Sequence, residues 1–293
     1  MKGFSVKPLI WITMLFLGLL PYQAFGLGLT PGSFDAILDT HVETLTVWQL
    51  AENNKIYVFD FHGLVTQGKT FNRITHLTEQ IQANAGYPRV LTTDEFIKYM
   101  DSLRRTQADF AFGHDLLVSE LVLFYNLADR DKIELLPEEI VLRTFLLDQG
   151  LIKVWRNFYQ SVQSDVVILS IPQEQPHTEG TPPVSKLARQ AIFLHELSHG
   201  EYYTNPHFAA YCRLFWNQSI NDAQRRAFVN LFKKYNYNTA SGELMVNEMQ
   251  AYLMFTPDPQ SFSASKLGVT EGELASMRDM FRRGRPPTRL PLR

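Results

Sequence analysis

Two histidines four residues apart, with a glutamate directly after the first, form the part of this sequence best suited to chemistry. They lie in His195-Glu196-Leu197-Ser198-His199, an H-E-x-x-H pattern. In a helix, residues i and i+4 lie one above the other on the same face, so both imidazoles can bind one metal ion. Glu196 lies at the rim of that face, where it can take a proton from a metal-bound water. The pattern predicts a Zn²⁺ site with Glu196 as general base.

The residues around this motif predict a helix that is buried on most sides. Two prolines precede it, and Ser185 is a suitable N-cap. Imidazoles in such a helix need polar partners, and a metal ion supplies one to both rings. The alternative is two core histidines bonded to backbone or carboxylate groups. Gly200 is expected to end or bend the helix. The apolar set in the middle of the helix is Leu187, Ala188, Ala191, Ile192, Leu194 and Leu197.

A catalytic zinc ion usually has three protein ligands and one open position, so a third ligand is needed. Three residues downstream of the motif are candidates: His207, Glu243 and Glu248. Glu243 falls in the first turn of a predicted helix that begins after Ser241, where the helix dipole explains a carboxylate. Glu248 lies within that helix among apolar residues, where a carboxylate is costly unless it is paired or metal-bound. Glu248 is therefore favoured over His207.

The two motifs together resemble those of a known group of proteins. HELSH, followed by Asn247-Glu248 and then Ala251, is similar to the zincin metallopeptidases of the gluzincin type, in which a second helix supplies a glutamate ligand. The resemblance covers about residues 190–255, and no specific named family matches the rest of the chain. It implies a zincin-like catalytic lobe with a small sheet and an active-site helix.

Residue by residue, the resemblance assigns roles to positions of this sequence. It implies that His195, His199 and Glu248 bind one Zn²⁺ ion per chain and that Glu196 acts as the base. It also implies that the β-branched run 165–172 forms a sheet-edge strand, beside which an extended substrate would pair. The polar segment 173–181 is expected to be a loop, either bordering a cleft or merely connecting.

Side chains that assist the metal site are harder to select. Tyr252 lies one helical turn after Glu248 and is our candidate for hydrogen bonding to an oxyanion, with Tyr202 and Tyr203 as alternatives. A carboxylate usually orients a zinc-bound histidine through a hydrogen bond. Three carboxylates are equal candidates for this role: Glu201, Asp222 and Glu243. The other histidines, among them His41, His62 and His114, are isolated in sequence and predict no second metal site.

The first 26 residues are typical of a secretory signal peptide. Lys2 and Lys7 precede a 13-residue apolar run, and Ala24 and Gly26 suit cleavage before Leu27. The run is short for a membrane span of about 20 residues. We therefore predict a secreted or periplasmic protein with no stable membrane insertion after cleavage; retention as an anchor is the alternative. A single cysteine in the whole sequence excludes an intrachain disulfide.

Composition limits the remaining function classes. The chain has 28 basic and 30 acidic residues, a net charge of −2, so nothing favours nucleic-acid binding. The predicted fold class is α+β and mostly helical, with an N-terminal α/β lobe at 27–140, a catalytic lobe at 141–281 and a disordered basic, proline-rich tail at 282–293. Strands are expected at 55–61 and 165–172. Helices are expected at 35–53, 93–105, 137–149, 152–163, 206–216, 222–234 and 270–282.

Two kinds of function fit these observations. The first is an exported zinc metallopeptidase that hydrolyses amide bonds in a peptide, a protein or cell-wall peptides. The second is a non-catalytic exported binding module on the same scaffold, which would have no need of Glu196. A zinc hydrolase of non-peptide substrates would share the site and differ only in what it binds.

Overall fold

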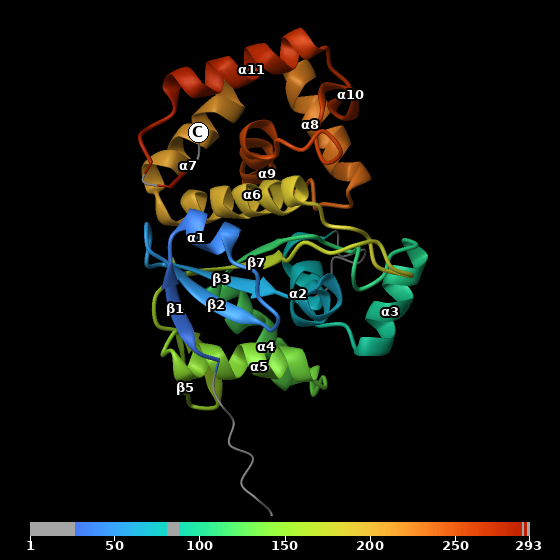
Figure 1. Cartoon of the computed structure of the whole chain (residues 1–293), viewed down its shortest axis with the longest axis vertical. Coiled ribbons are helices and arrows are strands. Elements are labelled where there is room, and N and C mark those ends of the chain that lie inside the picture. The colour runs from blue at the N-terminus through green and yellow to red at the C-terminus, as the bar shows by residue number, and fades with distance from the viewer. Residues whose placement is uncertain (1–26, 81–87, 289, 292–293) are drawn as a thin grey trace, which may run out of the picture.

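The structure is a computed structural model that describes residues 27–80, 88–288 and 290–291. The predicted signal peptide, residues 1–26, lies outside the described residues. Within the described part of the chain, no helix is both long enough and apolar enough to cross a membrane. The fold is α+β and mainly helical, as predicted, with a small mixed sheet at its centre (Figure 1).

The central sheet has the strand order β1-β2-β3-β7-β4. β1 runs parallel to β2, β2 antiparallel to β3, β3 parallel to β7, and β7 antiparallel to β4. A separate hairpin is formed by β5 (Ile152–Trp155) and β6 (Phe158–Ser161). The strands of the central sheet are β1 (Leu29–Gly32), β2 (Thr46–Leu50), β3 (Ile56–Phe61), β4 (His114–Leu117) and β7 (Val167–Pro172).

Helices cover both faces of this sheet, and the longest of them carries the H-E-x-x-H motif. They are α1 (Phe34–Asp39), α2 (Leu64–Glu79), α3 (Thr93–Ser102), α4 (Val118–Asp131), α5 (Pro137–Asp148), α6 (Lys186–Thr204), α7 (Pro206–Leu214), α8 (Asp222–Lys234), α9 (Gly242–Phe255), α10 (Ala264–Leu267) and α11 (Glu271–Gly284). A π-helical turn, Phe215–Ser219, follows α7. In Figure 1, α6 lies directly above the sheet, with α7 to α11 above it, while α4 and α5 lie below.

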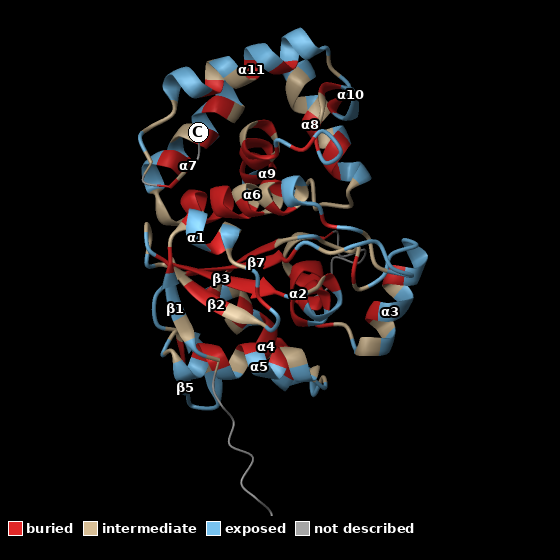
Figure 2. Ribbon diagram, viewed as in Figure 1, coloured by how far each residue is buried: buried red, intermediate tan, exposed pale blue. Residues whose placement is uncertain are grey.

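Alternation along the two middle strands divides the buried apolar residues into two cores. In β3, Ile56 and Val58 pack against α6 and the helices above it, whereas Tyr57, Phe59 and Phe61 pack against α2, α4 and α5. β7 divides its side chains between the two cores in the same way. Figure 2 shows the middle strands and much of α6 and α9 in the colour of buried residues. The motif helix is thus fixed between the sheet and α9.

The predicted N-caps of the two site helices are confirmed. The Ser185 hydroxyl accepts a hydrogen bond from the Ala188 backbone at the start of α6, and Ser241 accepts one from Leu244 at the start of α9. The sequence predicted that Gly200 ends or bends the helix, and an end there is wrong, because α6 continues to Thr204. A side chain at Gly200 would meet Ile56 of β3 at 2.8 Å, so the glycine lets the helix pack closely on the sheet.

Two predicted helices are wrong. In the segment 35–53, the helix ends at Asp39 and is followed by β2. β2 buries Val47 in one core and Trp48 and Leu50 in the other. Its apolar and polar residues therefore do not alternate as they do in a strand with one exposed face. The segment 152–163 forms the β5–β6 hairpin. Its turn residues Arg156 and Asn157 both have positive φ, 48° and 68°, as in a type I′ turn.

β7 is not the edge strand that was predicted. The strand itself is confirmed, but it lies between β3 and β4 and pairs with both. β4 stands at the end of the sheet order, so the edge belongs to this four-residue strand instead. The apolar segment 114–128 divides into β4 and most of α4.

The sheet takes strands from both sides of residue 140, where the sequence suggested a boundary between lobes. β7 pairs with β3 and β4, so the central sheet joins the two segments of the predicted division. α11 extends to Gly284, so the described part of the predicted tail begins with helical residues.

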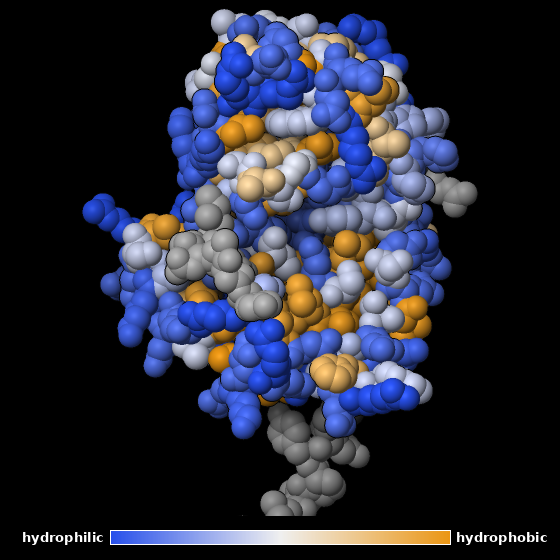
Figure 3. All heavy atoms as spheres, turned by 180° about the vertical axis from the view of Figure 1, so that it is seen from behind, coloured by the Kyte–Doolittle hydropathy of each residue, from blue (hydrophilic) through white to orange (hydrophobic). Residues whose placement is uncertain are grey.

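Figure 3 shows the face opposite to Figure 1, on which hydrophobic side chains are exposed mainly in the middle and lower parts.

A buried histidine in α2 makes stability depend on pH. His76 packs against the rings of Phe96 and Tyr99, and burial, with the Arg89 charge, lowers its pKa to about 4. Above pH 6.5 the ring is neutral in both folded and unfolded chains. Below that pH the unfolded chain binds a proton that the folded chain excludes, so stability falls as pH drops from about 6.5 to about 4, by about 3 kcal/mol.

This acid sensitivity can be measured by denaturant unfolding at a series of pH values. His76→Phe keeps an aromatic ring in the same apolar surroundings, so we expect the variant to lose about 3 kcal/mol less than the wild type over this interval. Identical pH profiles for the two proteins would contradict the assignment.

Candidate metal centre

The structure brings the three predicted metal ligands together. Glu248 on α9 faces both histidines of α6. Its Oε2 lies 3.7 Å from His195 Nε2, and its Oε1 lies 3.7 Å from His199 Nε2. One ligand atom from each residue falls within 4.8 Å of the others. Glu248 and His199 are buried, and the His195 side chain is 12% exposed. These spacings are suited to a single cation between the three side chains.

Thr256, just after α9, fixes which nitrogen of His195 is free. The Thr256 hydroxyl donates its proton to the Ala251 carbonyl at 3.0 Å, so it accepts a hydrogen bond from His195 Nδ1 at 2.8 Å. The proton of the neutral ring therefore resides on Nδ1, and the lone pair on Nε2 faces Glu248. A hydrogen bond that fixes the tautomer in this way is usual for a metal-binding histidine.

Asp115 of β4 is a fourth candidate ligand that the sequence did not reveal. Its Oδ1 lies 3.8 Å from His199 Nε2, and Asp115, Glu196 and His199 form a second group of ligand atoms within 4.8 Å of one another. Asp115 pairs with Leu169 across the sheet, and opposite residues point to the same face. Because Leu169 packs in the core that contains α6, Asp115 is directed toward the motif helix.

Glu196 lies against the backbone that precedes β4. A side chain at Gly113 would overlap the Glu196 carboxyl, so the absence of a side chain there makes room for it. Glu196 is buried at 6% exposure and borders the same pocket as His195 and His199. The predicted base is therefore beside the predicted ligands.

Five carboxyl groups at this centre and next to it lie close enough to repel one another, and together they favour a cation. Burial raises the pKa of Glu196, Asp115 and Glu79 well above ordinary values, and the neighbouring carboxylates raise these values further. Burial also raises the pKa of Glu248 to about 8, although a hydrogen bond with Tyr237 lowers it in part. Burial raises the pKa of Glu120 to about 7. A divalent cation would offset this repulsion, so the donor set fits a metal ion.

The centre opens into a pocket of about 470 Å³. Phe110 to Asp115, on the way into β4, border one side of it, and Tyr235, Tyr237 and Tyr252 border another. Tyr252 packs against His195 with ring centroids 4.7 Å apart and forms a hydrogen bond with Tyr237. Pro182 and Pro183, after the predicted loop 173–181, also line the pocket. The site is thus accessible to a small molecule or an extended chain.

Other residues considered from the sequence lie elsewhere. His207 is exposed at the start of α7 and is not part of the described ligand clusters. Glu243 binds Arg213 and the Tyr202 hydroxyl, Glu201 accepts a hydrogen bond from Asn205, and Asp222 pairs with Arg225. Tyr203 forms a hydrogen bond with Asp115. These three carboxylates do not orient His195, because the Thr256 hydroxyl accepts the hydrogen bond from His195 Nδ1.

Comparisons of this chain with protein-family models, with curated proteins and with solved structures each find no match.

Proposed function

We propose that this protein is a zinc-dependent hydrolase of amide bonds, a peptidase with a gluzincin-like ligand set on a zincin-like catalytic lobe. One observation carries the proposal: the Nε2 atoms of His195 and His199 lie 3.7 Å from the two oxygens of Glu248. Asp115, 3.8 Å from His199, is a further donor at the same centre. In accord with the predicted signal peptide, the enzyme would act in the periplasm or outside the cell.

The side chains divide the chemistry among them. A Zn²⁺ ion bound by His195, His199 and Glu248 would lower the pKa of a coordinated water and polarise a carbonyl group. The Glu196 carboxylate accepts the proton of the attacking water and passes it to the leaving nitrogen. Thr256 holds His195 in the tautomer that ligation requires. Tyr252 is placed at the pocket wall, where its hydroxyl can stabilise negative charge on the substrate oxygen.

The edge strand next to the pocket favours an extended peptide as substrate. β4 is the last strand in the sheet order, and the residues leading into it border the pocket. An extended chain can add to such an edge through backbone hydrogen bonds, while pockets receive its side chains. Aromatic side chains on the wall, including Phe110 and Phe112, suit apolar substrate residues.

Metal analysis tests the ligand set. We expect purified wild-type protein to bind zinc at this centre and Glu248→Ala to lose it, because the centre is much weaker without the carboxylate that faces both imidazoles. His207→Ala should keep its zinc, since His207 is exposed and outside the cluster. Zinc content after dialysis measures both outcomes.

Hydrolysis of casein and of quenched fluorescent peptides completes this test. A chelator should stop the reaction, and added Zn²⁺ should restore it. A zinc content of Glu248→Ala equal to that of the wild type, or a lower zinc content in His207→Ala, would contradict the assigned ligand. A metal-free protein without hydrolytic activity would support the binding module.

A further inference from the structure

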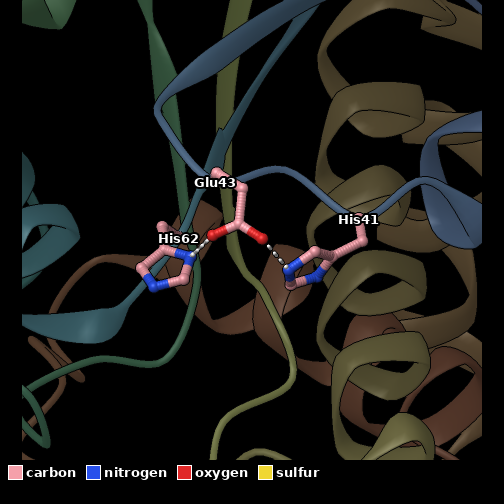
Figure 4. A group of neighbouring side chains, drawn as sticks. All are labelled: His41, Glu43 and His62. Atoms are coloured by element: carbon pink, nitrogen blue, oxygen red, sulfur yellow. Dashed lines mark hydrogen bonds and ion pairs between the residues drawn. The ribbon is translucent and has the colours of Figure 1, made fainter.

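A second group of metal-ligand side chains lies at the surface, in His41, Glu43 and His62. One ligand atom from each falls within 4.8 Å of the others. Their side chains are 59%, 79% and 60% exposed. Figure 4 shows the Glu43 carboxylate between the two imidazole rings, with one oxygen toward each. The cluster is separate from the candidate metal centre and has no part in the proposed hydrolysis.

Sheet pairing explains how distant residues meet here. Thr46 of β2 lies opposite Asp60 of β3, so the loop before β2 runs back past the residue that follows β3. That residue is His62, and the loop carries His41 and Glu43. His41 and Glu43 lie two residues apart in this loop, and their side chains are in contact.

A buried chain of hydrogen bonds fixes the tautomer of His41. The Gln173 amide nitrogen donates to Asp60 Oδ1 at 2.9 Å and to the Thr40 carbonyl at 3.2 Å, and Asp60 is itself held by Arg189. The Gln173 amide oxygen therefore faces His41 Nδ1, at 3.2 Å. This oxygen can only accept, so the proton of the neutral His41 ring is on Nδ1 and the lone pair is on Nε2.

This arrangement leaves the cluster with acceptors that face one another. His41 Nε2, with its lone pair, lies 3.0 Å from Glu43 Oε1. His62 Nδ1 donates a hydrogen bond to the Val42 carbonyl at 3.2 Å and lies 4.0 Å from Glu43 Oε2. A metal cation between Glu43 and His41 would be bound by both acceptors. Two imidazole nitrogens and one carboxylate are a donor set that zinc prefers.

We propose that His41, Glu43 and His62 bind a Zn²⁺ ion at this surface, with solvent in the remaining positions. His41 binds through Nε2, while Gln173 accepts the hydrogen bond from Nδ1. His62 binds through Nδ1 and gives up its hydrogen bond to Val42. The ion links the loop before β2 to the end of β3, and through Gln173, Asp60 and Arg189 this loop is connected to α6. The role of the metal is therefore structural.

Zinc titration of the full chain tests this site apart from the proposed function. We strip metals with a chelator and titrate Zn²⁺ at neutral pH, following binding by calorimetry and metal content. Wild type should bind two zinc ions per chain, and Glu43→Gln and His62→Gln should each bind one. Gln173→Met should weaken the surface site about 10- to 100-fold by removing the partner of His41 Nδ1.

Matched variants separate the two metal sites. His177→Gln removes an exposed histidine outside the described clusters and should keep both zinc ions. His199→Gln should lose only the ion at the candidate metal centre. If the surface proposal holds and the hydrolase proposal fails, wild type and His199→Gln each bind one ion, and His62→Gln binds none. Zinc stoichiometry unchanged by both Glu43→Gln and His62→Gln would overturn the surface site.

Discussion

Replacing Glu196 by glutamine should reduce peptide hydrolysis by about 10²- to 10⁴-fold, the range expected when a general base is removed. Glutamine has nearly the same shape as glutamate but cannot accept the proton of the attacking water. Glu196 borders the pocket beside the ligands, so the three ligand side chains keep their positions. Zinc content should therefore remain that of the wild type while turnover falls.

The measurement is the initial rate on quenched fluorescent peptides, compared with zinc content in the same preparation. Glu243→Gln is the matched control, because this glutamate binds Arg213 and Tyr202 away from the centre and should leave turnover near the wild-type value. Full hydrolysis by Glu196→Gln would show that another group acts as base.

Replacing Arg189 by methionine should cost about 3–5 kcal/mol of stability, as expected when one partner of a buried ion pair is removed. The Arg189 guanidinium donates to both oxygens of Asp60, at 2.9 and 3.0 Å, and to the Pro172 and Ile37 carbonyls. Both charged side chains are at most 2% exposed. The substitution leaves the Asp60 carboxylate and two carbonyls without these donors inside the protein.

Urea unfolding of wild type and variants measures this cost. The double variant Asp60→Asn, Arg189→Met should recover part of the loss, because the unpaired buried charge is then gone. Arg282→Ala breaks an exposed pair with Asp279 and should change stability by less than about 0.5 kcal/mol. Equal effects of Arg189→Met and Arg282→Ala would contradict the role assigned to the buried pair.

Local patterns in the sequence predicted which side chains would meet at the candidate metal centre. The i, i+4 spacing placed both histidines on one helical face, and the cost of burying Glu248 among apolar residues selected it over the exposed His207. Serines before α6 and α9 identified the helix starts, because their hydroxyls satisfy free backbone N–H groups. These signals depend on neighbouring residues, which the sequence displays directly.

What the sequence did not predict depends on residues that meet only after folding. Asp115 is followed by two leucines in a short strand, and its direction is set by pairing with Leu169. A carboxylate in an apolar segment was its one visible signal. Thr256 follows α9 with no pattern that marks its bond to His195. The β5–β6 turn uses Arg156 and Asn157 in place of the Asn-Gly pair that usually marks a type I′ turn.

The parallel pairing of β3 with β7 has a consequence for the folding rate. Ile56 lies opposite Val167, so the middle of the sheet closes only when a long intervening segment is brought together. Local contacts do not offset the entropy that is lost in closing such a loop. Proteins with many contacts between residues far apart in sequence therefore fold slowly. β7 also pairs with β4, which carries Asp115, and packs against α6, so we expect the candidate metal centre to form only when β7 has joined the sheet.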